Sequence, residues 1–322
     1  MTRIAPLAAL LAAAFAAAPA AQAQSYPARP LRLVIALAPG GGVDTSARLV
    51  AQKLTDAWGQ QVVAENRPGA GGTIATELVA HTAPDGYTLL ATSSAFSITP
   101  SLYKLPYDPV RDFTPVMRLV QSPHVLVAHP SVPVHNVREL VAFAKSHPNQ
   151  LLWSSSGNGS PQHLAVELFK LMTGTKIVHV PYKGTAPSIT DLIGGRVSLT
   201  AASVVSTMPH VTAGRLRGIA VLSSKRSQAA PQFPSVGESG VPGYEVDVWY
   251  GLFAPAGTPR EIVTRLYEEI ARNLAQPAVK ERMLTLGLEP DALGPEPFAA
   301  YVRAETTKWG KVIRAAAVRI DD

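Results

Sequence analysis

The sequence contains no cysteine in its 322 residues. The chain can therefore form no disulfide bond, offers no thiol nucleophile and cannot build a zinc site with thiolate ligands. It also has no cysteine to which a lipid anchor could be attached. A chain of this length with 47% hydrophobic residues can bury a core that needs no disulfide. An exported protein of this composition is compatible with a bacterial periplasm.

Apolar runs of membrane-spanning length are absent beyond the first segment of the chain. That segment, MTRIAPLAALLAAAFAAAPAAQA, has one early basic residue, Arg3, then an apolar run and the cleavage pattern Ala21-Gln22-Ala23. Prolines interrupt the run, which argues against a permanent membrane span. We therefore predict a signal peptide over residues 1–23, cleaved after Ala23, and a periplasmic mature protein. A retained N-terminal anchor is the alternative.

Clusters of positive charge are also lacking, although the net charge is +6. No basic run is longer than the Lys225-Arg226 pair. A nucleic-acid-binding protein usually gathers its basic residues into one stripe, so we expect no nucleic-acid partner. A diffuse positive field suits the attraction of small anions instead.

Motifs of the common catalytic and nucleotide sites are missing as well. The sequence has no G-x-S-x-G elbow, no H-E-x-x-H, and no Gly-Lys-Ser/Thr after PGGGVD. The eight histidines show no ligand spacing, so we predict no metal and no cofactor. A serine hydrolase using Ser160 in SSSGNGSPQHLA (154–165) remains an alternative. Against it, His163 lies only three residues away on the same predicted helix, whereas a catalytic base usually comes from elsewhere in the fold.

Strand-length apolar runs alternate with stretches of helical periodicity. The predicted strands cover residues 31–38, 60–66, 86–92, 151–157, 176–182 and 216–223. Apolar residues at helical spacing follow several of them, namely Ala47, Val50, Leu54, Ala57 and Trp58, then Ile74, Leu78 and Val79, and later Leu164, Leu168, Leu171 and Met172. This order predicts an α/β fold with parallel sheets.

Two segments are interpreted as crossings between two lobes. They are VLVAHPSVPVHN (125–136), an apolar strand that runs into a proline-rich connection, and VWYGLFAPAGTP (248–259). Residues 24–124 and 250–322 then form the first lobe, and residues 125–249 form a second lobe inserted into it. Long C-terminal helices, predicted at about 260–275 and 296–316, are expected to pack on the first lobe.

Four times, a predicted buried strand ends in a loop rich in glycine or serine that opens a helix. The four loops are Pro39–Asp44, Arg67–Thr73, Ser154–Ser160 and Tyr182–Thr185. In a parallel sheet such loops share the carboxyl edge, where ligands of open α/β sheets bind. Helix starts offer unpaired N–H groups, and glycine lets an anion approach the backbone closely. Two such edges facing each other would hold a small molecule with an acid group at each end.

Two residues of these loops also have plain structural interpretations. Asp44 could be a helix N-cap rather than a ligand-binding residue. Ser160 followed by Pro161 matches an N-cap with proline at the first helical position. This role is compatible with a ligand contact by Ser160.

At this point the sequence resembles the Bug/TctC family, the periplasmic substrate-binding proteins of tripartite tricarboxylate transporters. The motifs that carry the resemblance run along nearly the whole mature chain. They are PGGGVDTSAR (39–48), VVAENRPGAGG (62–72), PDGYTLL (84–90), SSGNGSPQHLAVELF (155–169), VPYKGTAPSITDLIGGRV (180–197), GRLRGIAV (214–221) and WYGLFAPAGTP (249–259).

The resemblance implies a type II periplasmic binding fold, two α/β lobes joined by two crossing strands, that closes on a small carboxylate. It implies delivery to membrane permease subunits, and we expect a monomer. One carboxylate would be held by the first lobe, partly through ordered water, at Pro39, Gly40, Gly41, Asp44, Gly69, Ala70, Gly71 and Gly72, with Ser93 and Ser94 as further donors. The other end would meet Ser155, Ser156, Gly157, Asn158, Ser160, His163, Tyr182, Lys183, Gly184 and Thr185.

One position departs from the family pattern. Many members carry an aspartate after the strand that follows GGRV, and Ala202 stands there in this sequence. A buried ligand ammonium would lack one counter-charge, which makes an amino-acid ligand less favourable. Tyr182 and Trp249 are candidates to wall the pocket, with ordinary core packing as the alternative for each. A receptor whose closed form signals to a membrane sensor remains an alternative to a transport protein.

Overall fold

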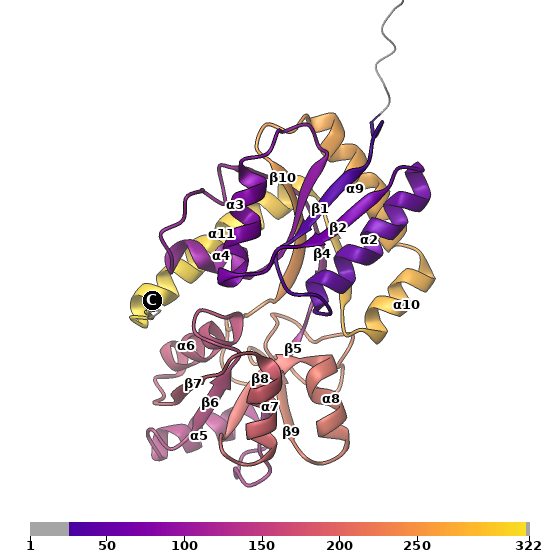
Figure 1. Ribbon diagram of the computed structural model, residues 1–322. Helices are drawn as coiled ribbons and strands as arrows, with labels where there is room; N and C mark the ends of the chain where they lie inside the picture. Colours follow the sequence, from indigo (N-terminus) through magenta and orange to yellow (C-terminus); the bar gives the residue numbers. More distant parts are fainter. Residues whose placement is uncertain (1–25, 320–322) are drawn as a thin grey trace, which may run out of the picture.

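The structure is a computed structural model that describes residues 26–319. The predicted signal peptide and its cleavage point lie outside the described residues. Among these residues, no helix is both long enough and apolar enough to cross a membrane. The chain forms two lobes, each built around its own sheet, one above the other in Figure 1.

The first lobe contains a six-stranded sheet in the order β11-β4-β10-β3-β1-β2. Its strands are β1 (Leu31–Ile35), β2 (Val62–Asn66), β3 (Thr88–Ser93), β4 (Phe113–Gln121), β10 (Trp249–Pro255) and β11 (Glu289–Leu293). Its helices are α2 (Gly42–Trp58), η1 (Ala70–Gly72), α3 (Thr73–Ala80), α4 (Ala95–Ile98), η2 (Thr99–Ser101), α9 (Arg260–Leu274), α10 (Pro277–Thr285) and α11 (Pro295–Ala315).

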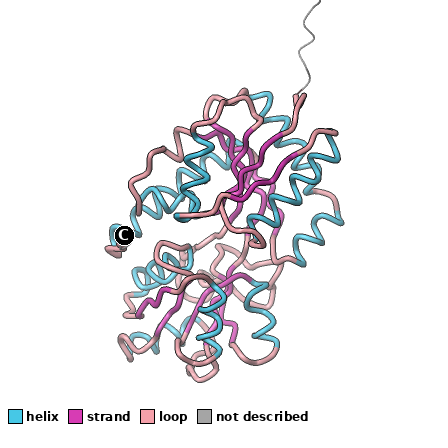
Figure 2. The backbone as a smooth tube through the Cα atoms, in the orientation of Figure 1, coloured by secondary structure: helices cyan, strands magenta, loops and turns pink. Residues whose placement is uncertain are grey.

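The second lobe contains a five-stranded sheet in the order β7-β6-β8-β5-β9. Its strands are β5 (His124–Ala128), β6 (Leu152–Ser155), β7 (Val178–Pro181), β8 (Leu199–Ser203) and β9 (Arg217–Val221). Its helices are α5 (Val137–Ser146), α6 (Pro161–Thr173), α7 (Thr185–Ile193) and α8 (Val204–Thr212). The tube in Figure 2 shows helices packed around the strands of both lobes. The predicted two-lobe α/β architecture is confirmed.

The prediction of wholly parallel sheets is wrong, because both sheets are mixed. β1 runs parallel to β2 and β3, and β6 runs parallel to β7 and β8. In contrast, β10 is antiparallel to β3 and β4, and β5 is antiparallel to β8 and β9. β5 and β10 are the strands that begin just after the chain passes from one lobe to the other. They start at the edge facing the other lobe, so they run opposite to the strands that end there.

The two passages between the lobes lie side by side. Ser122 donates its N–H to the carbonyl of Val248 at 2.7 Å, and Leu222 donates to His124 at 2.9 Å. The first passage therefore comes before β5, at Ser122–Pro123. The proline-rich segment 129–136, interpreted as part of the crossing, instead leads from β5 to α5 within the second lobe, and most of the second predicted crossing is strand β10.

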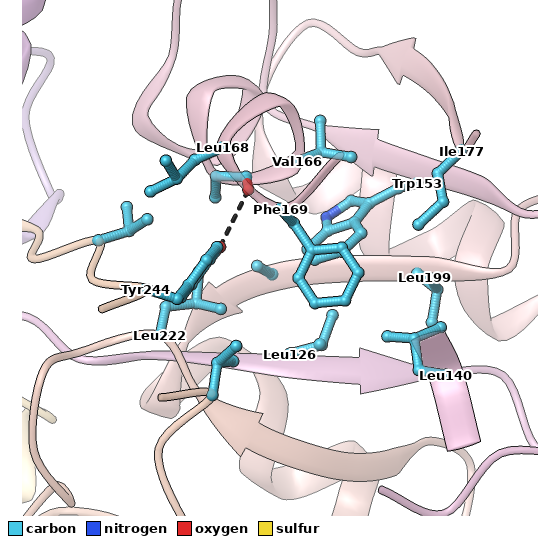
Figure 3. Packing of buried hydrophobic residues seen from close by; sticks show 14 of the residues in the cluster. Leu126, Leu140, Trp153, Val166, Leu168, Phe169, Ile177, Leu199, Leu222 and Tyr244 are labelled. Carbon is cyan, nitrogen blue, oxygen red and sulfur yellow. Dashed lines mark hydrogen bonds between the residues drawn. The ribbon is translucent and has the colours of Figure 1, made fainter. Parts of the chain in front are cut away.

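Apolar clusters cover both faces of each sheet. In β1, Leu33 and Ile35 belong to one cluster and Val34 to another, as expected for a strand buried on both sides. Figure 3 shows the main cluster of the second lobe, where Trp153 packs near Phe169 with ring centres 5.5 Å apart. In the same view the hydroxyl of Tyr244 donates to the carbonyl of Ala165 at 3.0 Å, so this buried phenol is satisfied.

Some residues predicted at the apolar helix faces are not buried. Ile74, Leu171 and Met172 are 52%, 44% and 39% exposed. Periodicity correctly predicted the helices, but side chains in the last turn of α6 and the first turn of α3 are exposed. The C-terminal helix also differs from expectation, because Trp309, together with two neighbours on α11, packs into the main cluster of the second lobe. α11 thus contacts both lobes.

Candidate ligand-binding site

The loops predicted to bind a ligand lie at the edges of the two sheets that face each other. In the first lobe, β3 ends at Ser93, opposite Tyr250 at the start of β10, where the chain arrives from the second lobe. In the second lobe, β8 ends at Ser203, opposite His124 at the start of β5. The parallel neighbours β1, β2, β6 and β7 end at the same two edges. Both carboxyl edges are therefore on the hinge side of their lobes (Figure 1).

The loop before α2 is held in shape by Asp44. Its carboxylate accepts the N–H of Gly40 at 3.0 Å, the amide of Asn66 at 2.8 Å and the guanidinium of Arg48 at 2.8 Å. Burial alone would raise the pKa of Asp44, but these hydrogen bonds outweigh it and lower the pKa below its usual value. Asp44 is not the N-cap, which is Gly41. Its carboxylate is thus engaged within the protein rather than directed at a ligand.

Replacing Asp44 by alanine should destabilise the protein by about 2–3 kcal/mol, because the N–H of Gly40, the amide of Asn66 and the guanidinium of Arg48 lose a buried, charged acceptor. Urea unfolding measures the loss. Asp56→Ala is the matched control, since Asp56 lies on the same helix, is exposed and contacts only Gln52. We expect that variant to change stability by less than about 0.5 kcal/mol. Equal effects of the two substitutions would contradict the structural role of Asp44.

The second loop of the first lobe is a run of backbone in the left-handed region. Gly69, Ala70, Gly71 and Gly72 all have positive φ. Gly72 is the most constrained, because a Cβ there would lie 3.2 Å from Cβ of Ala36, at the end of β1. The loop leads into α3, which begins without a side-chain cap. Gly72 thus allows this loop to pack closely against the end of β1.

The serines at the end of β3 are buried in the same edge. Ser93 and Ser94 are 7% and 1% exposed. Ser93 accepts the N–H of Ala95 at 3.4 Å, and the hydroxyl of Ser94 has no partner among the residues that the structure describes. Such an unpaired hydroxyl is available to water or to a ligand group.

In the second lobe, the loop after β6 is closed by its own serines. Ser160 caps α6 as predicted, accepting the N–H of His163 at 3.2 Å, and it donates to the carbonyl of Gly157 at 2.7 Å. Ser156 donates to Gln162 at 2.9 Å. Asn158 is exposed at the tip. The hydroxyls of Ser156 and Ser160 are therefore engaged within this part of the lobe, and the outer side of the loop presents backbone groups rather than free serine hydroxyls.

Two histidines lie beneath this loop. His163 on α6 and His179 on β7 stack with ring centres 3.8 Å apart and planes 8° apart. His163 Nδ1 accepts the N–H of Gly159 at 3.0 Å, and His179 Nε2 lies 2.6 Å from the hydroxyl of Ser155. Burial lowers the pKa of His163 to about 4 and that of His179 to about 3. Both rings are neutral at neutral pH.

The contact between Ser155 and His179 is not arranged for nucleophilic catalysis. Ser155 is fully buried, and its oxygen also accepts the N–H of Gly157 at 3.1 Å. A general base works best with a pKa near the operating pH, far above that of His179. Ser160, the residue proposed for the hydrolase alternative, is occupied as a helix cap. The geometry gives no support to a serine hydrolase.

The fourth loop opens α7. Gly184 is its N-cap, with φ of 111° and no side-chain cap, and its N–H is bound by the carbonyl of Ser156 at 3.0 Å. Tyr182 is half-buried and donates to Asp191 at 2.7 Å. Lys183 is exposed and Thr185 half-buried. Pro39, Gly40 and Gly41 of the first lobe are likewise exposed.

Ala202, singled out in the sequence as a departure from the family pattern, is fully buried on β8, where it pairs with Val125 of β5. Trp249 is fully buried in an apolar cluster of the first lobe, which favours core packing over a pocket wall. Its neighbour Tyr250 lies against the start of α2 instead, since a Cβ on Gly42 would lie 2.6 Å from the Tyr250 hydroxyl.

Sequence reasoning missed three contributors to this region: His179, Tyr250 and Asn66. Tyr250 directly follows Trp249, but only the alternation of side chains along β10 decides which aromatic faces the loop. His179 and Asn66 each occupy a predicted strand. Asn66 ends β2, so a polar residue at the carboxyl end of a strand was the available signal there, whereas His179 lies within β7 and gave no such signal.

The chain was compared with known proteins. A model of the tripartite tricarboxylate transporter family receptor (TctC) matches residues 46–318. Protein BugT of Bordetella pertussis is 35% identical over 326 aligned positions that cover 99% of each chain. Among solved structures, R. palustris Rpa4515 with adipate is 38% identical, has a TM-score of 0.79, and is matched over 91% of this chain and 99% of its own. MatC from Rhodopseudomonas palustris with bound malate is 33% identical, with a TM-score of 0.73 and coverage of 89% and 100%.

Proposed function

Since this chain belongs to the receptor family of tripartite tricarboxylate transporters, we propose that it is an extracytoplasmic solute-binding protein that captures a small carboxylate between its lobes. It is exported to the periplasm by a signal peptide cleaved after Ala23. It hands the ligand to the membrane permease subunits of a transporter of this type. The protein acts as a monomer and makes or breaks no bond in its ligand.

The observation that carries the proposal is that three helices at the facing edges begin without a side-chain cap. α2, α3 and α7 each begin at a glycine N-cap, and none has a side-chain cap. Other helices also lack a side-chain cap, α11 with its N-cap Gly294 among them; what distinguishes α2, α3 and α7 is that their starts lie at the two edges that face each other. N–H groups left uncapped at a helix start, at the positive end of the helix dipole, bind carboxylates through charge-assisted hydrogen bonds.

A ligand with an acid group at each end suits this arrangement best. The first lobe contributes the loops around Gly40 and Gly71, and the second contributes those around Gly157 and Gly184, partly through ordered water. The relatives solved with adipate and malate hold dicarboxylates of this kind. Because Ala202 supplies no carboxylate and Asp44 is engaged within its own loop, a ligand ammonium would find no counter-charge from these residues.

Binding is coupled to closure about the two passages between the lobes. We propose the predicted division with its boundaries moved by one residue to the strand starts: residues 24–123 and 249–322 form the first lobe and residues 124–248 form the second. A ligand that contacts both edges only in the closed state shifts the population towards that state by its differential affinity. The closed form then presents a composite surface to the permease. A membrane sensor that responds to the same surface is the second candidate function.

The proposal predicts that a dicarboxylate raises the melting temperature of residues 24–322 after carried-over ligand is removed by unfolding and refolding. At about 100 times its dissociation constant a ligand adds roughly 2.7 kcal/mol, which corresponds to a shift of several degrees. The panel contains adipate, malate, tricarboxylates, aromatic acids, acidic amino acids and the diamide of adipate.

A shift with one group of acids but not with the diamide would support the carboxylate site and name its class. A shift with an uncharged solute and with no acid would contradict the proposal. Mass spectrometry of the incubated ligand tests the hydrolase alternative, because we expect each compound to be recovered unchanged. Capture of the closed protein by permease subunits, rather than by a sensor, distinguishes the two candidate functions.

A further inference from the structure

The stacked histidines beneath the loop of residues 155–160 are more than packing. We propose that His163 and His179 are positioning residues that hold this loop in its ligand-binding conformation, an inference that rests on the proposed function of the loop. Neither residue needs to touch the ligand. Each acts through a polar group of the loop to which its ring is hydrogen-bonded.

The two rings fasten opposite ends of the loop. The ring of His163 accepts the N–H of Gly159 at 3.0 Å, and its own backbone N–H is bound by Ser160 at 3.2 Å. The ring of His179 bonds Ser155 at 2.6 Å, at the point where β6 ends. Ser155 in turn accepts the N–H of Gly157 at 3.1 Å. Imidazole nitrogens therefore orient the N–H of Gly159 directly and the N–H of Gly157 through Ser155.

Because the rings stack, the hydrogen bond between His163 and Gly159 and that between His179 and Ser155 depend on each other. With 3.8 Å between ring centres and nearly parallel planes, neither ring can turn without displacing its neighbour. His163 belongs to α6 and His179 to β7, so the stack also joins the two elements between which the loop emerges. The adjoining loop is tied in as well, because Tyr182 and Gly184 donate to the carbonyls of Ser155 and Ser156.

The hydrogen-bond pattern requires a neutral ring at His163. Its Nδ1 accepts a hydrogen bond from the N–H of Gly159, so the ring proton is on Nε2, which lies 3.7 Å from Oε1 of Glu167. That carboxylate is paired with Lys170 at 2.8 Å. These are the charged groups on α6 near the pair; from the strand side, His179 and Ser155 face it. A protonated Nδ1 would set a donor against the Gly159 donor.

Two substitutions of His163 separate positioning from packing. His163→Asn keeps an acceptor at the place of Nδ1, whereas His163→Leu keeps apolar volume and has no acceptor. We expect the asparagine variant to bind the probe within threefold of wild type and the leucine variant to bind at least tenfold more weakly. Stability should follow the opposite order, because the site is buried and leucine packs better than asparagine. The probe is adipate or malate, whichever the wild type binds more tightly, measured by calorimetry at pH 7.5.

Amide hydrogen exchange of the loop, measured without ligand, tests the inference independently of ligand binding. The Gly159 amide should exchange at least tenfold faster in His163→Leu than in wild type and close to the wild-type rate in His163→Asn. If a His163 variant does not fold, the same comparison is made with His179→Gln and His179→Leu, which alter the hydrogen bond to Ser155. Unchanged loop exchange in the leucine variants, or equal affinity in wild type and both variants, would overturn the inference. If the wild type binds no acid, the proposed function fails, while the exchange rates still decide whether the histidines hold the loop.

Discussion

Lowering the pH from 7 to 4.5 is expected to destabilise the protein by several kcal/mol. Burial lowers the pKa of His124 and of His163 to about 4 and that of His179 to about 3, against an ordinary value near 6.5. The unfolded chain therefore takes up protons first as the pH falls. The stabilisation from keeping these rings neutral is complete above about pH 6.5 and is lost as the pH falls towards 4. Each ring contributes at most about 2–3 kcal/mol of loss at pH 4.5.

One buried acid works in the other direction. Burial raises the pKa of Asp247 to about 6, with the nearby Glu245 adding to the effect. Because the folded-state pKa is raised, this group lowers stability fully above about pH 6, and the effect is relieved progressively as the pH falls from 6 towards the ordinary value of an aspartate. The net loss is therefore smaller than the sum for three histidines. It remains large against the 5–15 kcal/mol that typically separates folded from unfolded protein.

His124→Phe tests one of these contributions without touching the loops. His124 is buried, and its Nδ1 has no partner among the described residues, so the substitution removes a proton-binding group and no hydrogen bond from that atom. Urea unfolding at pH 7, 5.5 and 4.5 should show about 2 kcal/mol less acid loss in the variant. His135→Gln, at an exposed histidine, is the control variant. A wild-type stability that is flat between pH 7 and 4.5 would contradict the assignment of three buried neutral rings.

The sequence was sufficient to predict the elements that place the site. Apolar runs of strand length, each followed by a glycine- or serine-rich loop and a helix, correctly indicated β1, β2, β6 and β7 and the helices after them, and a further run correctly indicated β3. These are local signals: the run sets the strand, and Gly59 or Ser160 marks where a helix ends or begins. Two sheets with facing carboxyl edges then followed from chain order alone.

What could not be predicted depends on contacts between segments distant in the chain. Nothing local distinguishes β10, a central antiparallel strand, from an extended passage between lobes. The partnership of His163 with His179 requires knowing that α6 lies over β7. The role of Asp44 likewise depends on Asn66, which reaches it from the next strand. The exposure of Ile74 could not be predicted for the same reason, because helical periodicity identifies the apolar face of α3 but not whether another element packs on that face.

The hinge side of the first lobe contains a second group of interactions that no pattern indicated. Arg118 on β4 is 7% exposed, forms an ion pair with Asp291 on β11, and lies with its guanidinium carbon 4.2 Å from the ring centre of Tyr301 on α11. Asp247, at the second passage between the lobes, is buried close enough for Arg118 to act on its pKa. Arg118 is thus the cation that several elements share where the lobes join.

Replacing Arg118 by leucine is therefore expected to destabilise the protein by about 3–5 kcal/mol, because it removes the ion-pair partner of the half-buried Asp291 and one of the two cations, with Lys308, that act on the buried Asp247. Arg118→Lys should lose less, about 1–2 kcal/mol, since it keeps the charge but not the planar contact with Tyr301. Arg111→Ala is the matched control on the same lobe: its pair with Asp108 is exposed, and such pairs contribute about 0–1 kcal/mol. Adding Asp247→Asn to Arg118→Leu should restore part of the loss, because one of the unpaired carboxylates is removed. If Arg118→Leu unfolded in urea within 1 kcal/mol of wild type, the carboxylates would not depend on this cation, and the hinge would be stabilised by its apolar contacts alone.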